Sequence, residues 1–275
     1  MIELIEKAIS DIPDRETKIH VTREYLQLLI LKILYDRGYY KNLAFIGGTA
    51  LRFLYGLHRF SEDLDFSLIS RQGYNFDTLL KHIAYDLEKS GLSLDIKKQL
   101  EPPVQSAMFR FKDVLFQLGL SDIKSAMRSA IERKRNGMLP IKLEIDANPP
   151  KGWKIATVLV SKHFVFTVTT LDIPSLYALK LHACFYRKYT KGRDFYDLLW
   201  YLGRKETPDF KLMNNAIKQT EHKKIEVNSE NFRAFLKEKL AKIDFDKARR
   251  DVARFIEDKK ELKLINKDTI LNLQS

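Results

Sequence analysis

Residues 47–66 read GGTALRFLYGLHRFSEDLDF, and this stretch decides how the rest of the chain is interpreted. The short apolar segment before it, residues 43–46, predicts a strand that enters the glycine turn, and a helical apolar pattern follows the turn. Asp63 and Asp65 then lie on an extended segment at the start of a second predicted strand. Because side chains alternate along a strand, both carboxylates project to the same face.

Asp63 and Asp65 are one residue apart, so their α-carbons are about 6.6–6.8 Å apart in an extended segment. Two charges about 7 Å apart at an effective dielectric constant of about 20 repel by roughly 2.4 kcal/mol. Mg²⁺, which binds through one or two carboxylates plus substrate phosphates, suits such a pair, with Mn²⁺ as an alternative. Considered alone, the pattern is better explained by two surface aspartates on an edge strand.

The residues upstream of the pair reverse that preference. Gly48 and Thr49 lie in a predicted strand-to-helix turn, whose free N–H groups and positive dipole end can hold phosphate oxygens. Arg59 and Ser61 add a guanidinium and a hydroxyl that can contact more of a triphosphate. The order of these residues favours a magnesium-dependent site for a nucleoside triphosphate (NTP).

A third carboxylate is needed to complete such a metal site and to polarise the attacking group. Residues 141–147 alternate as a strand, with Glu144 and Asp146 on the same face. Glu144 is preferred because it lies in the middle of the strand, and Asp146 is the reserve. The alternative for this strand is a solvated charged face.

The C-terminal part has helical periodicity and offers a second group of charged residues. Lys180 lies among apolar residues, where it either extends to solvent or donates to a nucleotide phosphate. Asp194 and Asp197 are three residues apart, so they share a helix face and can orient Lys180 or Arg193. A structural role for these acids near a helix N-terminus is equally well supported by their spacing.

Composition limits the classes of protein. The 275 residues include 48 basic and 36 acidic side chains, so the formal net charge is +12 and a polyanionic partner, nucleic acid first, is favoured. No apolar run approaches the length of a membrane span, and the N-terminus lacks the pattern of a secretory signal, so we expect a cytoplasmic protein without a membrane partner. Cys184 is the one cysteine, which excludes an intrachain disulfide and predicts a small core residue.

Periodicity and turn signals also predict the remaining elements. Thr22 is a candidate cap for the first long helix. Strand-like segments give way to helices near residue 170, so we expect a mixed α/β domain over residues 1–170, with an N-terminal helix, and a helical domain over 171–275. The predicted helices are residues 21–38, 50–57, 76–89 and 121–135, and the predicted strands are residues 43–46, 64–68, 92–98, 107–118 and 141–147.

Together these motifs resemble the nucleotidyltransferase toxins of the AbiEii/AbiGii family, including the MenT-like members, within the DNA polymerase β-like nucleotidyltransferase superfamily. The resemblance spans roughly residues 40–257. It is most specific in the glycine turn with Arg-x-Ser-x-Asp-x-Asp, and in Lys180 with the Arg193–Asp197 motif. It implies an α+β fold, in which a minimal nucleotidyltransferase domain (a mixed sheet flanked by helices) is followed by an all-helical C-terminal domain.

The resemblance also implies roles for particular residues. Gly48 and Thr49 take the positions of the superfamily's Gly-Ser turn, where threonine replaces the usual serine and keeps the hydroxyl. Asp63 and Asp65 take the positions of the metal ligands. Lys180 and Asp194 take the family's positions in the helical domain, which would then contribute them to the site.

The function that the resemblance implies is transfer of a nucleotide from an NTP, with Mg²⁺, by a toxin opposed by an antitoxin from a neighbouring gene. For MenT-like members the acceptor is the 3′ end of tRNA, and modification of that end blocks translation. Two alternatives stay open. One is transfer of a nucleotide or phosphate to a protein hydroxyl, including the protein's own. The other is a basic RNA-binding module without catalytic activity.

Overall fold

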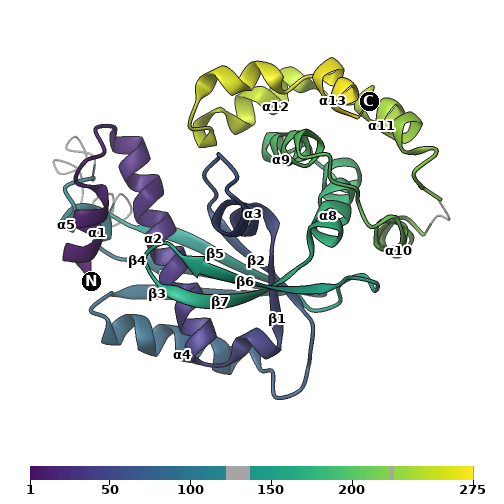
Figure 1. Cartoon of the computed structure of the whole chain (residues 1–275). Coiled ribbons are helices and arrows are strands. Elements are labelled where there is room, and N and C mark those ends of the chain that lie inside the picture. The colour runs from purple at the N-terminus through teal and green to yellow at the C-terminus, as the bar shows by residue number, and fades with distance from the viewer. Residues whose placement is uncertain (122–136, 223–225, 275) are drawn as a thin grey trace. The chain divides into compact units, whose positions relative to one another are not determined.

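A mixed β-sheet organises the first part of the chain (Figure 1). The computed structural model describes residues 1–121, 137–222 and 226–274. The strands are β1 Leu43–Ile46, β2 Asp63–Leu68, β3 Leu94–Glu101, β4 Val104–Phe111, β5 Leu139–Asp146, β6 Ile155–Ser161 and β7 Val165–Leu171. In the described residues they form one seven-stranded sheet in the order β3-β4-β5-β2-β1-β7-β6. β2 runs parallel to β5, whereas β4 runs antiparallel to both β3 and β5.

Several helices begin directly after an Asp or Asn side chain that caps them. The helices are α1 Ile2–Ile9, α2 Arg15–Asp36, α3 Gly47–Tyr55, α4 Phe76–Lys89, α5 Val114–Gln117, α8 Ile173–Tyr186, α9 Gly192–Gly203, α10 Phe210–Glu221, α11 Phe232–Leu240, α12 Phe245–Val252 and α13 Lys267–Leu273, with 3₁₀ turns η1 Tyr39–Lys41, η2 Ala253–Phe255 and η3 Lys259–Leu264. In α2, α4, α8, α10 and α12 the capping side chain accepts a hydrogen bond from the backbone N–H three residues later. Such caps satisfy N–H groups that have no partner within the helix.

The chain forms two compact units that are interleaved in sequence. Unit 1 comprises Met1–Phe45, Ser61–Asn148 and Thr157–Thr169, and unit 2 comprises Ile46–Phe60, Pro149–Ala156 and Thr170–Ser275. The glycine turn and Arg59 therefore belong to the same unit as the C-terminal helices. Asp63 and Asp65 belong to the unit that contains most of the sheet.

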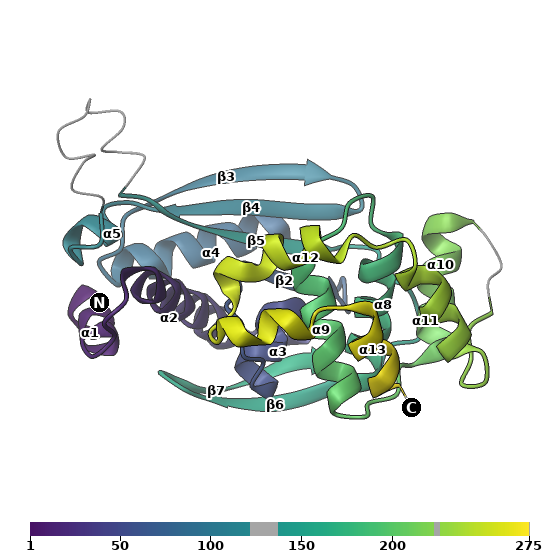
Figure 2. The same cartoon turned by 90° about the horizontal axis from the view of Figure 1, so that it is seen from above.

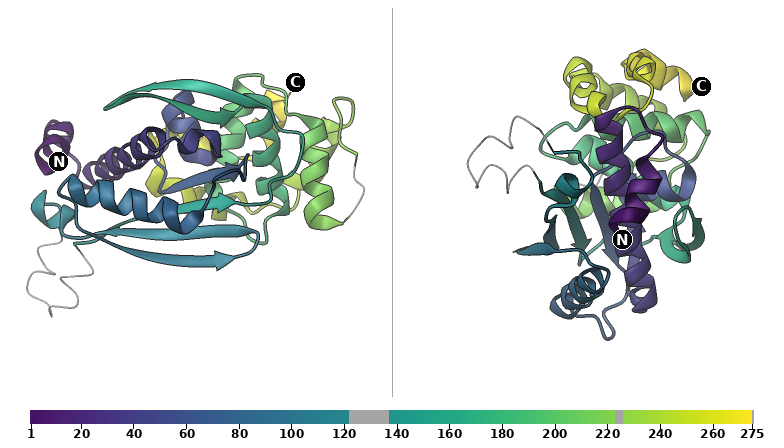
Figure 3. Two further views of the ribbon diagram at one scale, coloured as in Figure 1. Left: turned by 90° about the horizontal axis from the view of Figure 1, so that it is seen from below. Right: turned by 90° about the vertical axis from the view of Figure 1, so that its left-hand side faces the viewer.

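In unit 1, α2 and α4 lie side by side across one face of the sheet (Figure 3). Leu64 of β2 and Leu143 of β5 are fully buried, and Phe66 packs against Phe45 with ring centroids 5.3 Å apart. Because strand side chains alternate, burial of these apolar residues turns the polar residues of β2 and β5 to the opposite face.

In unit 2, α9 contacts α8, α12 and α13 (Figure 2). Phe195 and Leu198 of α9 are fully buried, and the rings of Tyr177 and Tyr201 stack with centroids 4.4 Å apart. Gly192 allows α12 to approach the start of α9, because a β-carbon there would lie 1.9 Å from the Ala248 carbonyl oxygen. Among the described residues, none of the helices combines the length and the apolar character needed to cross a membrane.

The structure confirms the predicted α+β class, with a mixed sheet and a helical C-terminal region. The predicted helix over residues 76–89 has its observed bounds in α4. The long helix α2, however, begins at Arg15 because Asp14 caps it, and the Thr22 hydroxyl bonds the Lys18 carbonyl inside the helix instead. The predicted strand over residues 107–118 ends at Phe111, since Asp113 adopts a left-handed conformation with φ of 59°. The predicted helix over residues 121–135 lies outside the described residues.

Candidate active-site residues

In unit 1 the acidic pair lies beside Glu144 on one face of the sheet. Asp63 is paired with Lys142, and Asp65 with Glu144, in the parallel register of β2 and β5. Paired residues of neighbouring strands project to the same face, and alternation keeps Asp63 and Asp65 on one side. The carboxylates of Asp63, Asp65 and Glu144 and the ammonium of Lys142 therefore lie together on this face, and we call this group the acidic face. Asp146, two residues beyond Glu144, projects to the same side near the end of β5.

Lys142 is the cation of the acidic face. Its Nζ lies 2.7 Å from Glu144 Oε1, and both side chains are about one-third exposed. Burial acts to lower the pKa of Lys142, but its hydrogen bond to Glu144 and the charges of Asp63 and Asp65 outweigh that effect and raise the pKa above the ordinary value. The ammonium therefore partly neutralises a group of like charges that would otherwise repel one another.

Asp146, the reserve candidate for the third carboxylate, lies farther along β5. Its register partner is Ser67, and its Oδ1 accepts a hydrogen bond of 2.9 Å from the Asn148 backbone N–H. Burial raises the pKa of the Asp146 carboxyl, and the bond from Asn148 partly opposes that rise. By register, Glu144 is the neighbour of the acidic pair, whereas Asp146 closes the turn after the strand.

The acidic face fits a metal that is held only partly by the protein. Among the described residues, no group of three or more His, Cys, Asp or Glu side chains is arranged to hold a metal ion. Mg²⁺ is normally held by one or two carboxylates together with substrate phosphates and water, so a complete protein cage is not required. The hard oxygen donors of Asp63 and Asp65 match that requirement.

In unit 2 the glycine turn forms the start of α3. Gly47 has φ of +80°, a conformation that favours glycine, and the helix follows directly after Ile46. No side chain of the described residues caps this N-terminus. Gly48 and Thr49 are both buried in the first turn of α3, whereas Gly47 is partly exposed.

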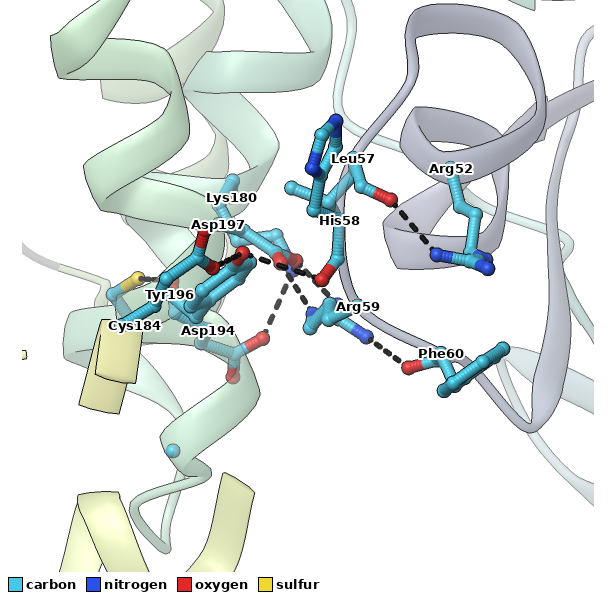
Figure 4. Close-up of polar contacts among 12 residues, drawn as sticks. Arg52, Leu57, His58, Arg59, Phe60, Lys180, Cys184, Asp194, Tyr196 and Asp197 are labelled. Carbon is cyan, nitrogen blue, oxygen red and sulfur yellow. Dashed lines mark hydrogen bonds and ion pairs between the residues drawn. The ribbon is translucent and has the colours of Figure 1, made fainter. Parts of the chain in front are cut away.

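Arg59, predicted to contact phosphate, is held by Asp197 (Figure 4). Its Nε and Nη2 donate to the two carboxylate oxygens of Asp197 at 2.6 and 2.7 Å, and Nη1 donates to the Phe60 carbonyl at 3.0 Å. Arg59 is 2% exposed, which leaves little surface for a phosphate. The geometry favours a positioning role for Arg59, because a bidentate ion pair fixes the plane of the guanidinium relative to the plane of the Asp197 carboxylate.

Gly48 lies directly beside that guanidinium. A β-carbon at Gly48 would be 2.1 Å from Arg59 Nη2. The absence of a side chain at Gly48 is therefore what lets Arg59 reach Asp197 past the start of α3. This requirement is steric, since Gly48 has no positive φ.

Lys180 of α8 and Asp194 of α9, predicted to act together, are in contact (Figure 4). Lys180 Nζ lies 2.9 Å from Asp194 and 2.8 Å from Asp197, and Arg187 binds the other oxygen of Asp194 at 2.7 Å. Burial would lower the pKa of Lys180, but the two carboxylates raise it above its ordinary value. Burial would likewise raise the pKa of Asp194, but Lys180 and Arg187 hold it below its ordinary value.

These side chains form one ionic cluster in unit 2. Its members are Arg59, Lys180, Arg187, Asp194 and Asp197, three cations and two anions, so the cluster carries one surplus positive charge. Except for Arg187, their side chains are at most 10% exposed. A mostly buried cluster with a surplus positive charge is suited to an anionic ligand such as a phosphate group.

Sequence reasoning missed Arg187 and the pairing of Arg59 with Asp197. The available signal was charge balance: two buried carboxylates on an otherwise apolar helix need more than one cation.

Arg193, predicted to support the site, lies with its guanidinium carbon 4.6 Å from the Phe255 ring centroid. Ser61, a predicted nucleotide contact, is buried in unit 1, and its carbonyl accepts a hydrogen bond from Gln27. Cys184 is a buried core residue as predicted, and burial raises the pKa of its thiol.

The fold is similar to that of a solved structure that aligns with nearly the whole chain. It is similar to the crystal structure of a candidate nucleotidyltransferase from H. pylori, with a TM-score of 0.53 and 23% sequence identity over 92% of this chain and 94% of that one. The structure of JHP933 from Helicobacter pylori aligns with a TM-score of 0.49 and 23% identity over 93% and 88% of the two chains.

The family follows from a match that covers most of the sequence. The model of the family described as nucleotidyl transferase AbiEii toxin, type IV toxin–antitoxin system, matches residues 29–271, so this chain belongs to the AbiEii family of nucleotidyltransferase toxins. A comparison with curated proteins finds no match.

Proposed function

We propose that this protein transfers a nucleotide from an NTP to an RNA hydroxyl, with the 3′ end of tRNA as the acceptor, and thereby blocks translation. The observation that carries the proposal is the register of β2 and β5, which brings Asp63 and Asp65 beside Glu144 on one face. Membership of the AbiEii family supports nucleotidyl transfer and an antitoxin partner. The net charge of +12 supports RNA as the acceptor.

In the proposed reaction, the residues that the sequence motifs single out have separate roles. Asp63 and Asp65 would bind Mg²⁺, which neutralises phosphate charge when bound. The first-turn N–H groups at Gly48 and Thr49 would bind triphosphate oxygens. Lys180, held by Asp194, would donate to the same triphosphate.

The chemical step is displacement at the α-phosphorus. The acceptor hydroxyl oxygen forms a bond to that phosphorus, the bond to the bridging oxygen breaks, and pyrophosphate leaves. The hydroxyl proton would pass to Glu144, whose Oε1 also lies 2.7 Å from Lys142 Nζ. Glu144 therefore has two roles to reconcile, proton acceptor and ion-pair partner.

The test is incubation of purified protein with total tRNA, Mg²⁺ and each labelled NTP in turn. We expect label on tRNA with at least one NTP, and its loss in Asp63→Asn and in Asp65→Asn. Absence of label with every NTP, from protein shown to be folded, would contradict the proposal. A mass increase on protein instead would indicate a protein hydroxyl as acceptor, and toxicity that survives Asp63→Ala would indicate a binding module.

A further inference from the structure

The loop between α8 and α9 has an unusual composition. Residues 187–191 read RKYTK, with three basic side chains, no acidic one and a tyrosine in the middle. Tyr189 is 61% exposed, and it is the one strongly exposed aromatic residue in the described part of unit 2. A single exposed tyrosine needs no explanation by itself, so its neighbours decide its significance.

Two cations of the same loop flank the Tyr189 ring. The Arg187 guanidinium carbon lies 5.9 Å from the ring centroid, and Lys191 Nζ lies 5.5 Å from it. Both distances are within the range of cation–π attraction, which orients the ring, and 61% of Tyr189 nevertheless stays exposed. Exposed aromatic rings among basic side chains are typical of surfaces that bind single-stranded nucleic acid, where bases stack and phosphates pair with the cations.

The loop is also connected to the ionic cluster. Arg187 binds Asp194 at 2.7 Å while it flanks Tyr189, so one side chain contacts both the ring and the residue that holds Lys180. A base stacked on Tyr189 would therefore lie within one side chain of the proposed triphosphate contact. This position suits the acceptor strand of a nucleotide transfer.

We infer that Tyr189 is a stacking platform for an unpaired base of the RNA acceptor, with Lys188 and Lys191 contacting the adjacent phosphates. The inference deepens the proposed function, since it assumes that the acceptor is RNA. It assigns to the loop a substrate-binding role, distinct from that of the residues that bind the NTP. The preference is for single strands, because paired bases cannot stack on a protein ring.

The experiment measures binding of the full chain to a fluorescently labelled 12-nucleotide single-stranded RNA by anisotropy, without NTP. We expect Tyr189→Ala to weaken binding about 5- to 150-fold, the range that corresponds to the loss of one base–aromatic stacking contact. Tyr189→Phe keeps the ring and should bind within about threefold of wild type. A phenylalanine variant as weak as the alanine variant would overturn the stacking role.

Tyr85 of α4 provides a matched control. It is 60% exposed, and the Arg37 guanidinium carbon lies 5.9 Å from its ring centroid, so its exposure and cation geometry match those of Tyr189. Tyr85 belongs to unit 1, whereas all members of the ionic cluster belong to unit 2. Tyr85→Ala should leave RNA binding unchanged. Equal losses in the two alanine variants, or none in either, would contradict the inference.

The salt dependence separates stacking from charge. Lys188→Gln/Lys191→Gln should reduce the slope of log affinity against log salt by about 1.4, or about 0.7 for each phosphate that is no longer neutralised. Tyr189→Ala should weaken binding at every salt concentration and leave the slope unchanged. A lower slope in the double lysine variant together with wild-type affinity in Tyr189→Ala would assign the loop a purely electrostatic role and would overturn the inference.

Two further measurements test whether Tyr189 binds a base of the RNA or the base of the NTP. The same RNA annealed to its complement should bind equally to wild type and to Tyr189→Ala, and NTP binding measured by calorimetry should be the same in both. Weaker NTP binding with unchanged RNA binding would mean that Tyr189 holds the substrate base, and would overturn the inference. If RNA binding depends on Tyr189 but no nucleotide is transferred, the proposed function fails while the platform stands.

Discussion

Gly48 shows at the scale of one residue how a motif position can carry a steric requirement in addition to the role predicted for it. The sequence pattern predicts that Gly48 lets a phosphate approach the backbone, and in the structure a β-carbon at Gly48 would also lie 2.1 Å from Nη2 of the Arg59 guanidinium. That guanidinium is fixed by Asp197, the residue that also binds Lys180. Gly48 is thus linked through two ion pairs to the lysine proposed to contact the triphosphate.

Gly48→Ala should therefore destabilise the protein although it adds one methyl group. The new β-carbon would lie 2.1 Å from Arg59 Nη2, and the neighbouring Asp197 is fully buried. We expect a decrease in the free energy of unfolding of about 1–3 kcal/mol if the side chains shift and about 3–5 kcal/mol if the buried pair breaks. Urea denaturation measures the free energy of unfolding.

Gly203, the last residue of α9, is the matched control, because a β-carbon there would have no heavy atom within 4 Å. Gly203→Ala should be neutral or more stable by up to about 1 kcal/mol, since alanine has the higher helix propensity. Equal destabilisation by both substitutions would show that the contact with Arg59 is not the cause.

Lys142 is paired with Glu144, the carboxylate that the sequence analysis prefers as the third metal ligand. Lys142→Met removes the ammonium from the acidic face and leaves its three carboxylates. We expect tighter binding of Mn²⁺ in the absence of NTP, by about fivefold, since a partly exposed ion pair contributes up to about 1 kcal/mol. The readouts are calorimetry and the Mn²⁺ concentration at which thermal stabilisation is half-maximal.

Lys142→Arg keeps the positive charge and is the control for that measurement. It should bind Mn²⁺ with nearly the wild-type affinity. Unchanged affinity in Lys142→Met would mean that the lysine does not compete with the metal. Weaker affinity would mean that it positions Glu144 for binding.

At the scale of elements, the local sequence pattern predicted the helices and strands whose formation depends on residues close together in the sequence. Strand β2 and its polar face follow from the alternation of Asp63, Leu64 and Asp65, and helix α4 follows from its helical pattern. The pairing of β2 with β5 joins residues about eighty positions apart, and Arg59 meets Asp197 at a separation of 138. Such contacts depend on tertiary packing, which periodicity does not encode.

The pair of helices α8 and α9 leads to a pH prediction. Asp194 has a lower pKa in the folded chain than in the unfolded chain, because Lys180 and Arg187 stabilise its charged form against the opposing effect of burial. Its contribution is therefore complete above its unfolded pKa of about 3.9 and is lost as the pH falls through the folded pKa. Asp194→Asn should cost about 3–5 kcal/mol near neutral pH, because it leaves buried cations without a partner.

The difference in stability between wild type and Asp194→Asn should shrink as the pH falls below about 4, as measured by denaturation at a series of pH values. Asp268 of α13 is exposed and serves as the control. Asp268→Asn should change stability by less than about 1 kcal/mol at every pH. A difference for Asp194→Asn that stays constant down to about pH 3 would contradict the assigned ion pairs.

At the scale of the whole molecule, two properties have to be separated: a positive charge of +12 that favours RNA, and an acidic face that would repel it. A module that only binds RNA gains nothing from carboxylates that face phosphates. An enzyme needs them, because a metal can convert that repulsion into attraction at the reacting phosphate alone. RNA affinity should therefore depend on the salt concentration, whereas nucleotide transfer should depend on the carboxylates of the acidic face.

The double variant Asp63→Asn/Asp65→Asn tests that separation. It raises the net charge by two, so tRNA should bind at least as tightly as to wild type, while transfer of nucleotide is abolished. In both proteins log affinity should fall with log salt by about 0.7–0.9 for each phosphate neutralised, with closely similar slopes measured by anisotropy from about 50 to 300 mM salt. A flat slope in both would remove the basic surface as the source of RNA affinity. Weaker tRNA binding by the double variant would show that the carboxylates contribute to RNA affinity. The proposed separation of RNA binding from the acidic face would then be wrong.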